Sequence, residues 1–322
     1  MAFAEGLNRS ALEVFERAER DAEKLSILHL ELNCGARVLD FGVNVRGGLQ
    51  AGVQLASICL GGLAEVAISS GDQSVWPGPW IRVATDFPVR SCLFGQYAGW
   101  PVSVGKFFAM GSGPMRVLRG REKMLEHLEA HDDSEIAVGV LECDKVPDCE
   151  IARQIASECG ISPEGLRIAV APTRSVAGCV QVVARSVETS LHKLYELGFP
   201  LSAVKHAYGI APLPPPAPDF ATGIGRANDA ILYGGHVTLW VDADDEQIAS
   251  IGAKVPSSAS KDFGAPFAEI FKNYNYDFYK VDPGLFSPAE VALNNLKTGR
   301  AFHFGELRDD LISRSFAVEQ MS

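Results

Sequence analysis

The chain has 322 residues, 47% of them hydrophobic, and a formal net charge of −11. This length exceeds the usual size of one compact core, so two domains are expected. The acidic balance argues against a nucleic-acid partner, because such affinity comes mainly from lysine and arginine side chains that neutralise phosphates. A membrane span is not expected either, because the richest apolar run, residues 53–68, is interrupted by Gln54, Glu65 and a glycine pair.

The cellular compartment is inferred from the first residues and from the cysteines. Residues 1–6 lack a basic stretch followed by an apolar one, so no secretory signal is expected. The seven cysteines are an odd number and contain no Cys-x-x-Cys pair. Such cysteines are typical of reduced, mostly buried side chains, and the sequence therefore predicts a cytoplasmic protein.

The first third of the chain alternates between helical and extended patterns. Apolar residues at helical spacing predict a helix over residues 8–24, with Asn8 or Ser10 as its N-cap. A strand–helix–strand pattern follows, and its parts are residues 36–42, 49–60 and 64–69. Three short β-like runs, broken by glycine and proline, occupy residues 81–85, 89–94 and 102–108.

The rest of the chain alternates more clearly. The predicted elements are a helix over 121–130, a strand over 135–141, a helix over 147–159 and a strand over 166–171. After a further helix around Arg185, residues 208–218 are expected to form an extended loop, because their prolines lack an amide hydrogen. A strand over 230–242 and a short helix over 265–273 complete the prediction.

An arginine, a carboxylate and an imidazole lie on one side of an otherwise apolar predicted helix. Residues three and four apart are neighbours on a helix, so Arg185 is expected to meet Glu188, and Glu188 to meet His192. An Arg–Glu ion pair on a helix surface is the commoner explanation for this pattern. The alternative is a reactive centre, in which a carboxylate held by a guanidinium accepts a proton from water.

Two patterns that resemble cofactor sites are incomplete. The segment Gly223-Ile224-Gly225 lacks the third glycine of a dinucleotide-binding fingerprint, and the chain has no Gly-Lys-Ser/Thr phosphate loop. His127 and His131 have metal-ligand spacing on a predicted helix, but no third ligand of matching pattern accompanies them. The sequence therefore favours solvated helix histidines and no metal.

Three glycine-rich stretches contain polar residues, and they are residues 96–100, 111–116 and 225–230. Glycine lets the backbone approach a ligand closely, and Gly113 is the candidate for such an approach. Arg116 or Arg226 can meet a phosphate or carboxylate. Turns use the same residue types, so each stretch alone is more typical of a turn than of a binding site.

Taken together, these stretches resemble the methenyltetrahydromethanopterin cyclohydrolase family almost from end to end. The matching segments are GARVLDFG at 35–42, GLQAG at 48–52, ICLGGL at 58–63, QYAGW at 96–100, GSGP at 111–114, RSVET at 185–189, YGIAPLPP at 208–215, GRANDAILYGG at 225–235 and DFYKVDPGLFSPAE at 277–290. One departure is Ala227, which stands where the family usually has threonine.

The resemblance implies a fold of two α+β domains with a substrate pocket between them, assembled as a homotrimer, with no metal or redox cofactor. We place an N-terminal α+β domain at residues 1–115 and a C-terminal α+β domain at 116–322, whose last segment can pack back on the first. The family's catalytic pair, an arginine and a glutamate one helical turn apart, falls on Arg185 and Glu188. The local spacing and the resemblance thus indicate the same two residues.

The implied reaction is the reversible hydrolysis of 5,10-methenyltetrahydromethanopterin, or a close pterin variant, to the 5-formyl compound. Glu188 would take the proton of the attacking water, and Arg185 would orient the carboxylate and favour its ionised form. The candidate substrate contacts are Gln96, Asn228 and Asp229 at the pterin edge, Trp100 and Tyr233 beside the ring, Gly113 near the pocket, and Arg116 and Arg226 at the carrier's acidic tail.

Two other functions remain open at this point. One is a protein that binds or channels the same pterin carrier without turning it over, and the other is an enzyme of different chemistry on that carrier, such as formyl transfer. The presence of both Arg185 and Glu188 argues against the non-catalytic alternative. The composition favours a role in formaldehyde oxidation over methanogenesis, while the carrier variant and the direction of flux are not determined by the sequence.

Overall fold

The computed structural model describes residues 6–277 and 280–317. Residues 1–5, considered above for a secretory signal, and Phe278 and Tyr279 of the last family-like segment lie outside the described residues. The chain forms two compact units. Unit 1 comprises the chain up to Ala64 and Arg90–Gln181, and unit 2 comprises Glu65–Val89 and the chain from Val182.

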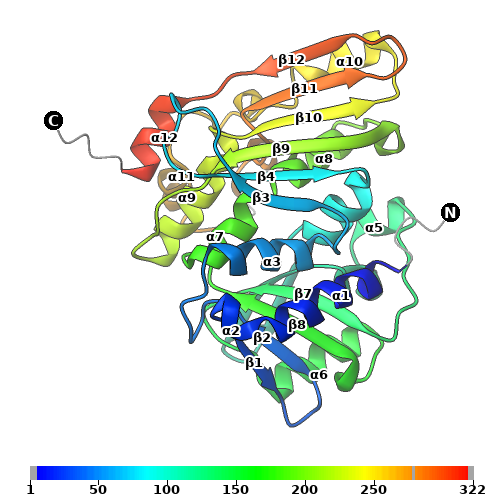
Figure 1. Cartoon of the computed structure of the whole chain (residues 1–322). Coiled ribbons are helices and arrows are strands. Elements are labelled where there is room, and N and C mark those ends of the chain that lie inside the picture. Colours follow the sequence, from blue (N-terminus) through cyan, green and yellow to red (C-terminus); the bar gives the residue numbers. More distant parts are fainter. Residues whose placement is uncertain (1–5, 278–279, 318–322) are drawn as a thin grey trace. The chain divides into compact units, whose positions relative to one another are not determined.

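The division differs from the expected boundary after residue 115, which falls inside unit 1. The reason is strand pairing, because β6 (Phe107–Ser112) lies before this position and pairs with β7 (Ala137–Glu142), which lies after it. Each unit has its own six-stranded mixed sheet and its own helices, as Figure 1 shows. The expected α+β class with two sheet-containing domains is confirmed.

Unit 1 is built around a sheet with the strand order β1-β2-β8-β7-β6-β5. Its other strands are β1 (Leu28–Glu31), β2 (Arg37–Asp40), β5 (Trp100–Val104) and β8 (Leu166–Ala171). Strands β2, β8 and β7 are mutually parallel, and the outer pairs are antiparallel. Its helices are α1 (Leu7–Arg20), α2 (Ala22–Leu25), α3 (Leu49–Cys59), α4 (Met115–Arg119), α5 (Lys123–His127) and α6 (Cys149–Glu158), together with most of α7 (Val176–Val183), whose last two residues belong to unit 2.

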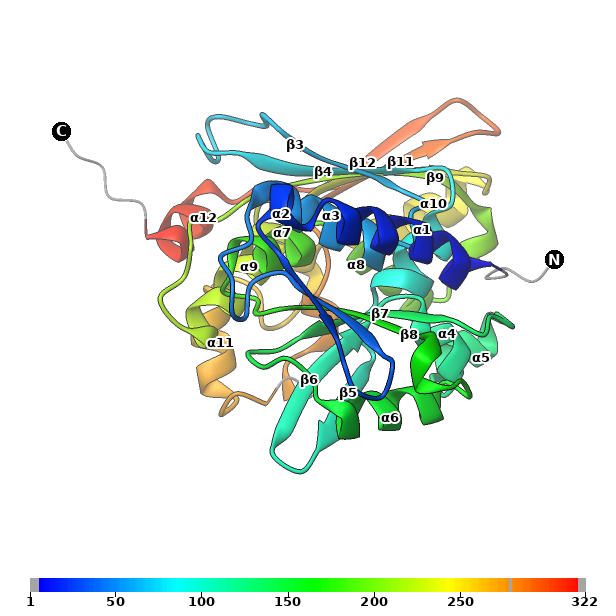
Figure 2. The ribbon, with the colours of Figure 1, turned by 60° about the horizontal axis from the view of Figure 1, so that its bottom comes forward.

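Helices cover both faces of the unit 1 sheet, as Figure 2 shows for α1 and α3 on one side and α6 on the other. Side chains alternate between the faces of a strand, so neighbours in β2 enter different cores. Leu39 packs in the cluster with α1 and α3, and Val38 packs in the cluster with α6. Burial on both faces explains why β7 and β8 are nearly continuous apolar runs.

Unit 2 has a sheet with the strand order β12-β11-β10-β9-β4-β3, in which only β10 and β11 are parallel neighbours. Its strands are β3 (Glu65–Ser69), β4 (Trp80–Thr85), β9 (Val204–Pro212), β10 (His236–Val241), β11 (Glu290–Asn295) and β12 (Ala301–Gly305). Its helices are α8 (Ser186–Glu196), α9 (Phe220–Leu232), α10 (Asp245–Gly252), α11 (Phe267–Asn273) and α12 (Asp309–Phe316).

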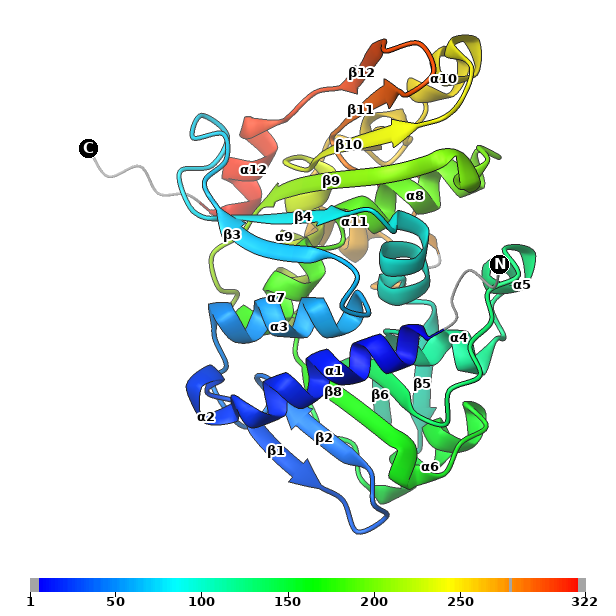
Figure 3. The same ribbon diagram turned by 45° about the vertical axis from the view of Figure 1, so that its right-hand side comes forward.

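The two faces of the unit 2 sheet differ. In β10 the residues Val237, Leu239 and Val241 are fully buried, and the residues between them are only half-buried. Figure 3 shows α8 and α10 against one face of this sheet. The alternation therefore separates a buried face under the helices from a more open one.

Many expected elements are present at nearly the expected residues, and they are β2, α3, β3, β4, β7, α6, β8 and α11. The three elements of the predicted strand–helix–strand pattern are present, but the two strands do not share a sheet, because β2 pairs in one sheet and β3 in the other. The first helix is divided at Asp21, and Gly6 is its N-cap. Asn8 is instead fully buried, where its Nδ2 donates to Asp132 and its Oδ1 accepts from the Val138 amide.

Three local predictions are wrong. Residues 89–94 are not extended but belong to a π-helical segment, Val89–Gln96. Residues 208–212 are the end of β9 rather than a loop, because the first proline is Pro212 and the strand is paired on both sides. Residues 225–230 are part of α9 and not a turn, and because α9 continues to Leu232, the strand expected over 230–242 begins only at His236. Among the described residues, no helix is both long and apolar enough to cross a membrane.

Candidate active site

Arg185 and Glu188 form an ion pair at the start of α8. The Nε and Nη2 groups of Arg185 donate to Glu188 Oε2 at 3.2 and 3.1 Å. The side chains are 13% and 3% exposed, respectively, so this is not the exposed surface pair that is common on helices. The predicted contact between these two residues is confirmed.

The backbone around Arg185 explains how the pair is formed. Helix α7 ends at Val183, and Arg185 is the N-cap of α8 with φ −89° and ψ 7°, so the chain turns here instead of continuing as one helix. Glu188 lies in the first turn of α8, where the helix dipole favours a carboxylate. The turn lets the guanidinium fold forward onto that carboxylate.

A glycine in the central strand allows α8 to lie close to the sheet. A Cβ atom added at Gly209 of β9 would lie 2.8 Å from Val187 Cγ2 and closer still to Ser186 Oγ. Contacts this short do not occur in folded proteins, so any larger residue here would require Ser186 or Val187 to move. Because Ser186 follows Arg185 directly, this close approach fixes the position of the ion pair relative to the sheet.

The second oxygen of Glu188 differs from the first. Both guanidinium contacts go to Oε2, and within the described part of the chain no residue donates a hydrogen bond to Oε1. The expected contact between Glu188 and His192 is also not found there, and His192 Nε2 lies 3.9 Å from Glu196 Oε1 instead. A buried, oriented carboxylate with one oxygen free of hydrogen-bond donors is suited to accept a proton from water.

The candidates Gln96, Trp100 and Gly113 all lie in unit 1. Gln96 ends the π-helical segment and is fully buried. Trp100, the first residue of β5, is 1% exposed, and the Arg119 guanidinium lies 4.4 Å from its ring centroid. Gly113 has φ +93°, and its amide donates to Gly95 O at 2.6 Å, so its glycine is required by the backbone.

The partners of Arg116 lie inside the protein, and they do not support the expected contact with the carrier's acidic tail. Its side chain is fully buried, with Nε donating to Glu122 Oε1 at 2.8 Å and Nη2 to the other oxygen of the same carboxylate. Nη1 donates to Phe94 O at 2.8 Å. A buried guanidinium must be paired in this way, and these contacts hold Arg116 inside unit 1.

Arg226 and Asn228 lie on α9 and are half-buried. Arg226 donates from Nε to Ser315 O at 3.2 Å and from Nη1 to Pro216 O at 2.8 Å, and so connects α9 with the proline-rich segment and α12. Asn228 Nδ2 donates to Ile224 O, one helical turn earlier. These contacts leave the Asn228 carbonyl oxygen without a hydrogen bond from any described residue.

Asp229 and Tyr233 are buried on the other side of α9. Asp229 accepts from the Phe267 amide at 2.8 Å and from Ser315 Oγ at 2.6 Å, and burial raises its pKa to about 7. Tyr233 donates to Ala265 O at 2.6 Å, and burial raises its pKa to about 12. Both side chains are used to hold α11 and α12 against α9, which favours a structural role.

The remaining residues of this stretch also pack inside unit 2. Ala227, where the family usually has threonine, is fully buried in α9. A Cβ at Gly225 would lie 2.8 Å from Ala268 Cβ, so this glycine serves the close packing of α9 and α11. The absence of a side chain at Gly225 is what the helix packing requires, which the sequence alone did not indicate.

The predicted histidine pair does not share a helix. Helix α5 ends at His127, and the positive φ of Glu129 turns the chain before His131. A spacing of four residues brings side chains together only within one helix, so it does not bring His127 and His131 together. The described residues that can hold a metal together are instead His236, Glu290 and His303, which sequence spacing could not bring together.

A buried polar cluster in unit 1 was also not anticipated. Gln181 Nε2 donates to Cys59 Sγ at 3.4 Å, and Cys59 Sγ lies 3.3 Å from Ser112 Oγ. Gln181 is fully buried, and its Oε1 accepts no hydrogen bond from the described residues. The three residues come from three separate elements, so no local sequence pattern connects them.

The ion pair in unit 2 provides an oriented, buried carboxylate of the kind that general acid–base catalysis uses, and comparisons identify the family. The family model described as "Cyclohydrolase (MCH)" matches residues 6–316. Methenyltetrahydromethanopterin cyclohydrolase of Rhodopirellula baltica is 53% identical over 318 residues, which cover 97% of this chain and 95% of the relative. The chain therefore belongs to the cyclohydrolase (MCH) family.

Relatives of the same name occur in other organisms. That of Methylobacillus flagellatus is 48% identical and covers 92% of this chain and 90% of its own length. That of Methanospirillum hungatei is 44% identical, with coverages of 96% and 98%. The match to the family thus extends along nearly the whole chain, as the sequence resemblance indicated.

Proposed function

We propose that this chain catalyses the reversible hydrolysis of 5,10-methenyltetrahydromethanopterin, or a close pterin variant, to the 5-formyl compound. Full-length similarity to enzymes named methenyltetrahydromethanopterin cyclohydrolase supports the substrate class. The observation that carries the mechanism is the buried Arg185–Glu188 pair. A protein that only binds the carrier would have no need for an oriented, buried carboxylate.

The reaction begins with a carbon that is already electrophilic. In the methenyl substrate one carbon bridges N5 and N10 as an amidinium-like cation. Water adds to this carbon as Glu188 takes its proton, and a hydroxylated tetrahedral intermediate forms. The bond from carbon to N10 then breaks as N10 receives the proton from Glu188, the hydroxyl group of the intermediate loses its proton to solvent water, and the formyl group remains on N5. General acid–base assistance of this kind contributes about 10²–10⁴-fold to the rate.

Arg185 acts in this mechanism by positioning the carboxylate. Its two donors fix Glu188 Oε2, so that Oε1 is the oxygen available to the attacking water. The negative charge of Glu188 in turn favours the cationic substrate carbon.

The direct test is to mix the purified protein with the methenyl carrier and follow the loss of the methenyl chromophore. Loss without any acceptor supports hydrolysis, loss only with a formyl acceptor would indicate transferase chemistry, and binding without loss would indicate a carrier protein. Glu188→Gln should retain carrier affinity and reduce turnover by at least about 10²-fold. Near-normal turnover in this variant would disprove the assigned role.

Several finer properties belong to the same proposal. No metal or redox cofactor is required, because the substrate carbon carries its own positive charge. We further propose a cytoplasmic homotrimer that acts in formaldehyde oxidation, with Gln96 and Asn228 as contacts of the pterin edge and Trp100 near the ring. Light scattering on the purified protein would measure the oligomeric state, and a mass near that of one chain or two would exclude the trimer.

A further inference from the structure

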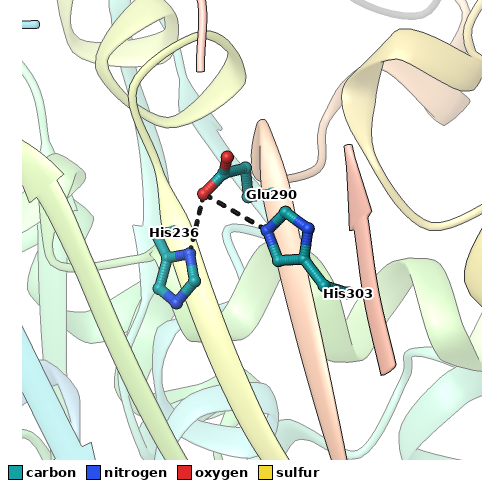
Figure 4. Close-up of side chains that lie close together, drawn as sticks. All are labelled: His236, Glu290 and His303. Atoms are coloured by element: carbon teal, nitrogen blue, oxygen red, sulfur yellow. Dashed lines mark hydrogen bonds and ion pairs between the residues drawn. The ribbon is translucent and has the colours of Figure 1, made fainter. Parts of the chain in front are cut away.

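A cluster of two imidazoles and one carboxylate lies on the unit 2 sheet, as Figure 4 shows. We propose that His236, Glu290 and His303 form a binding site for a divalent transition metal ion, with Zn²⁺ as the best-suited ion. The residues come from three neighbouring strands, β10, β11 and β12. The ion would therefore connect the three strands at this end of the sheet.

The register of the strands places the cluster on the face opposite α8. Gly209, which faces α8, is paired with Val237, so the preceding residue His236 points to the other face. Glu290 is the direct partner of His236, and His303 lies opposite Ala292 on the same side of β11 as Glu290. The site is thus separated by the sheet from the ion pair of Arg185 and Glu188.

The distances fit a metal site after small side-chain movements. His236 Nδ1 lies 2.9 Å and His303 Nε2 lies 3.6 Å from the same oxygen, Glu290 Oε2. One ligand atom from each residue lies within 4.8 Å of the others. Tetrahedral zinc with bonds of about 2.0–2.2 Å separates its ligand atoms by about 3.3 Å, which lies between the two observed distances.

The surroundings of the ligands also suit an ion. His236 Nε2 lies 3.2 Å from Thr238 Oγ1, a hydrogen-bond partner that fixes the ring and leaves Nδ1 for the metal. The rings of His236 and His303 are nearly parallel, with centroids 6.3 Å apart. The side chains of His236, Glu290 and His303 are 30%, 18% and 55% exposed, so an ion can enter and keep a water ligand.

The ligand types define the ion. Two imidazoles and one carboxylate suit zinc and its neighbours in the first transition row, whereas Mg²⁺ and Ca²⁺ prefer sites made of oxygen atoms. Without an ion, the same residues form two ion pairs that share one carboxylate whenever the histidines are protonated. The two possibilities predict different responses to added metal.

The experiment is a titration of the tag-free, full-length protein, first treated with a chelator, with ZnCl₂ by calorimetry. One Zn²⁺ per chain should bind, the melting temperature should rise with zinc concentration, and MgCl₂ should produce neither effect. Glu290→Gln and His303→Ala should each weaken zinc binding by more than about 100-fold, since loss of a ligand's hydrogen-bond partner alone costs about 10–100-fold. Cobalt as a spectroscopic probe should give visible bands in the unmodified protein only.

His206→Ala is the matched control. His206 lies on β9 of the same sheet and pairs with a single carboxylate, with Nδ1 2.7 Å from Asp86 Oδ1. This variant should bind zinc like the unmodified chain. Zinc binding that is absent from the unmodified chain, or that survives in both His303→Ala and His236→Ala, would overturn the proposal.

Discussion

Gly209→Ala tests whether the close approach of α8 to β9 positions the catalytic pair. The added methyl group would lie 2.8 Å from Val187 Cγ2, whereas ordinary contact begins at 3.4 Å. Val187 is fully buried, and valine has one strongly preferred χ1 angle in a helix. We therefore expect the start of α8 to retreat by about half an ångström or more rather than the side chain to turn, since β9 is held by strands on both sides. Arg185 and Glu188 would move with it.

Overpacking of this kind costs about 1–3 kcal/mol of folding free energy. For a domain of this size, each kcal/mol lowers the melting temperature by about 2–4 °C. Misplacement of a catalytic group by about 1 Å can cost about 10²-fold in rate. We therefore expect Gly209→Ala to fold with a lower melting temperature and to lose about 10- to 100-fold in kcat.

Calorimetry and the chromophore assay would measure the two effects separately. Gly48→Ala is the control, because a Cβ at Gly48 meets no atom within 4 Å. In a background carrying Ser186→Ala and Val187→Ala, the added methyl group has more room, so Gly209→Ala should cost less stability there than in the unmodified chain. Equal costs in both backgrounds, or an unchanged kcat in Gly209→Ala, would refute the reasoning.

Three further predictions follow from the side-chain environments. Arg185→Lys should lose most activity, because an ammonium cannot replace two guanidinium donors to Glu188 Oε2; full activity would leave Arg185 as a simple ion-pair partner. Burial raises the pKa of Asp229 to about 7, above that of an unfolded aspartate, so the native state holds an extra proton between about pH 4 and 7. The free energy of unfolding should therefore fall as pH rises through this range. Chemical denaturation of Asp229→Asn should not show this decrease, and the same dependence on pH in the variant and the unmodified protein would contradict the assignment. Burial also raises the pKa of Cys143 and Cys159 to about 12, so these thiols stay protonated and brief alkylation of the folded protein should leave turnover unchanged. Treatment with a chelator should leave turnover unchanged as well, because the substrate carbon needs no Lewis acid. Loss of activity on chelation that added zinc restores would overturn the metal-free mechanism.

The sequence predicted those features that depend on near neighbours. The Arg185–Glu188 contact follows from helical spacing, and β8 follows from a short apolar run. The end of β9 was missed because its conformation is set by pairing with Trp80 and with His236, which lie far away in the chain. The prolines from Pro212 onward indicated a loop over residues 208–218, but pairing with distant strands makes residues 208–212 extended.

The expected substrate contacts show the same limit. Arg116 was assigned to the carrier's acidic tail because a guanidinium can meet a carboxylate and because its stretch is part of the family resemblance. Its actual partners are Glu122 and the Phe94 carbonyl, and neither spacing nor composition reveals that the side chain is fully buried. The division into units was missed for a similar reason, because β3 and β4 join strands that follow more than a hundred residues later.

This interrupted connectivity has a consequence during synthesis on the ribosome. The β3–β4 hairpin emerges early, but the edge of β4 that pairs with β9 waits until Pro212 has been translated. At about 5–20 residues per second, the delay is on the order of 6–25 s. During this time the nascent chain presents an unpaired strand edge, which is prone to misassociation. We therefore expect a dependence on chaperones that bind nascent chains, and slower translation between residues 85 and 212 should increase the aggregated fraction.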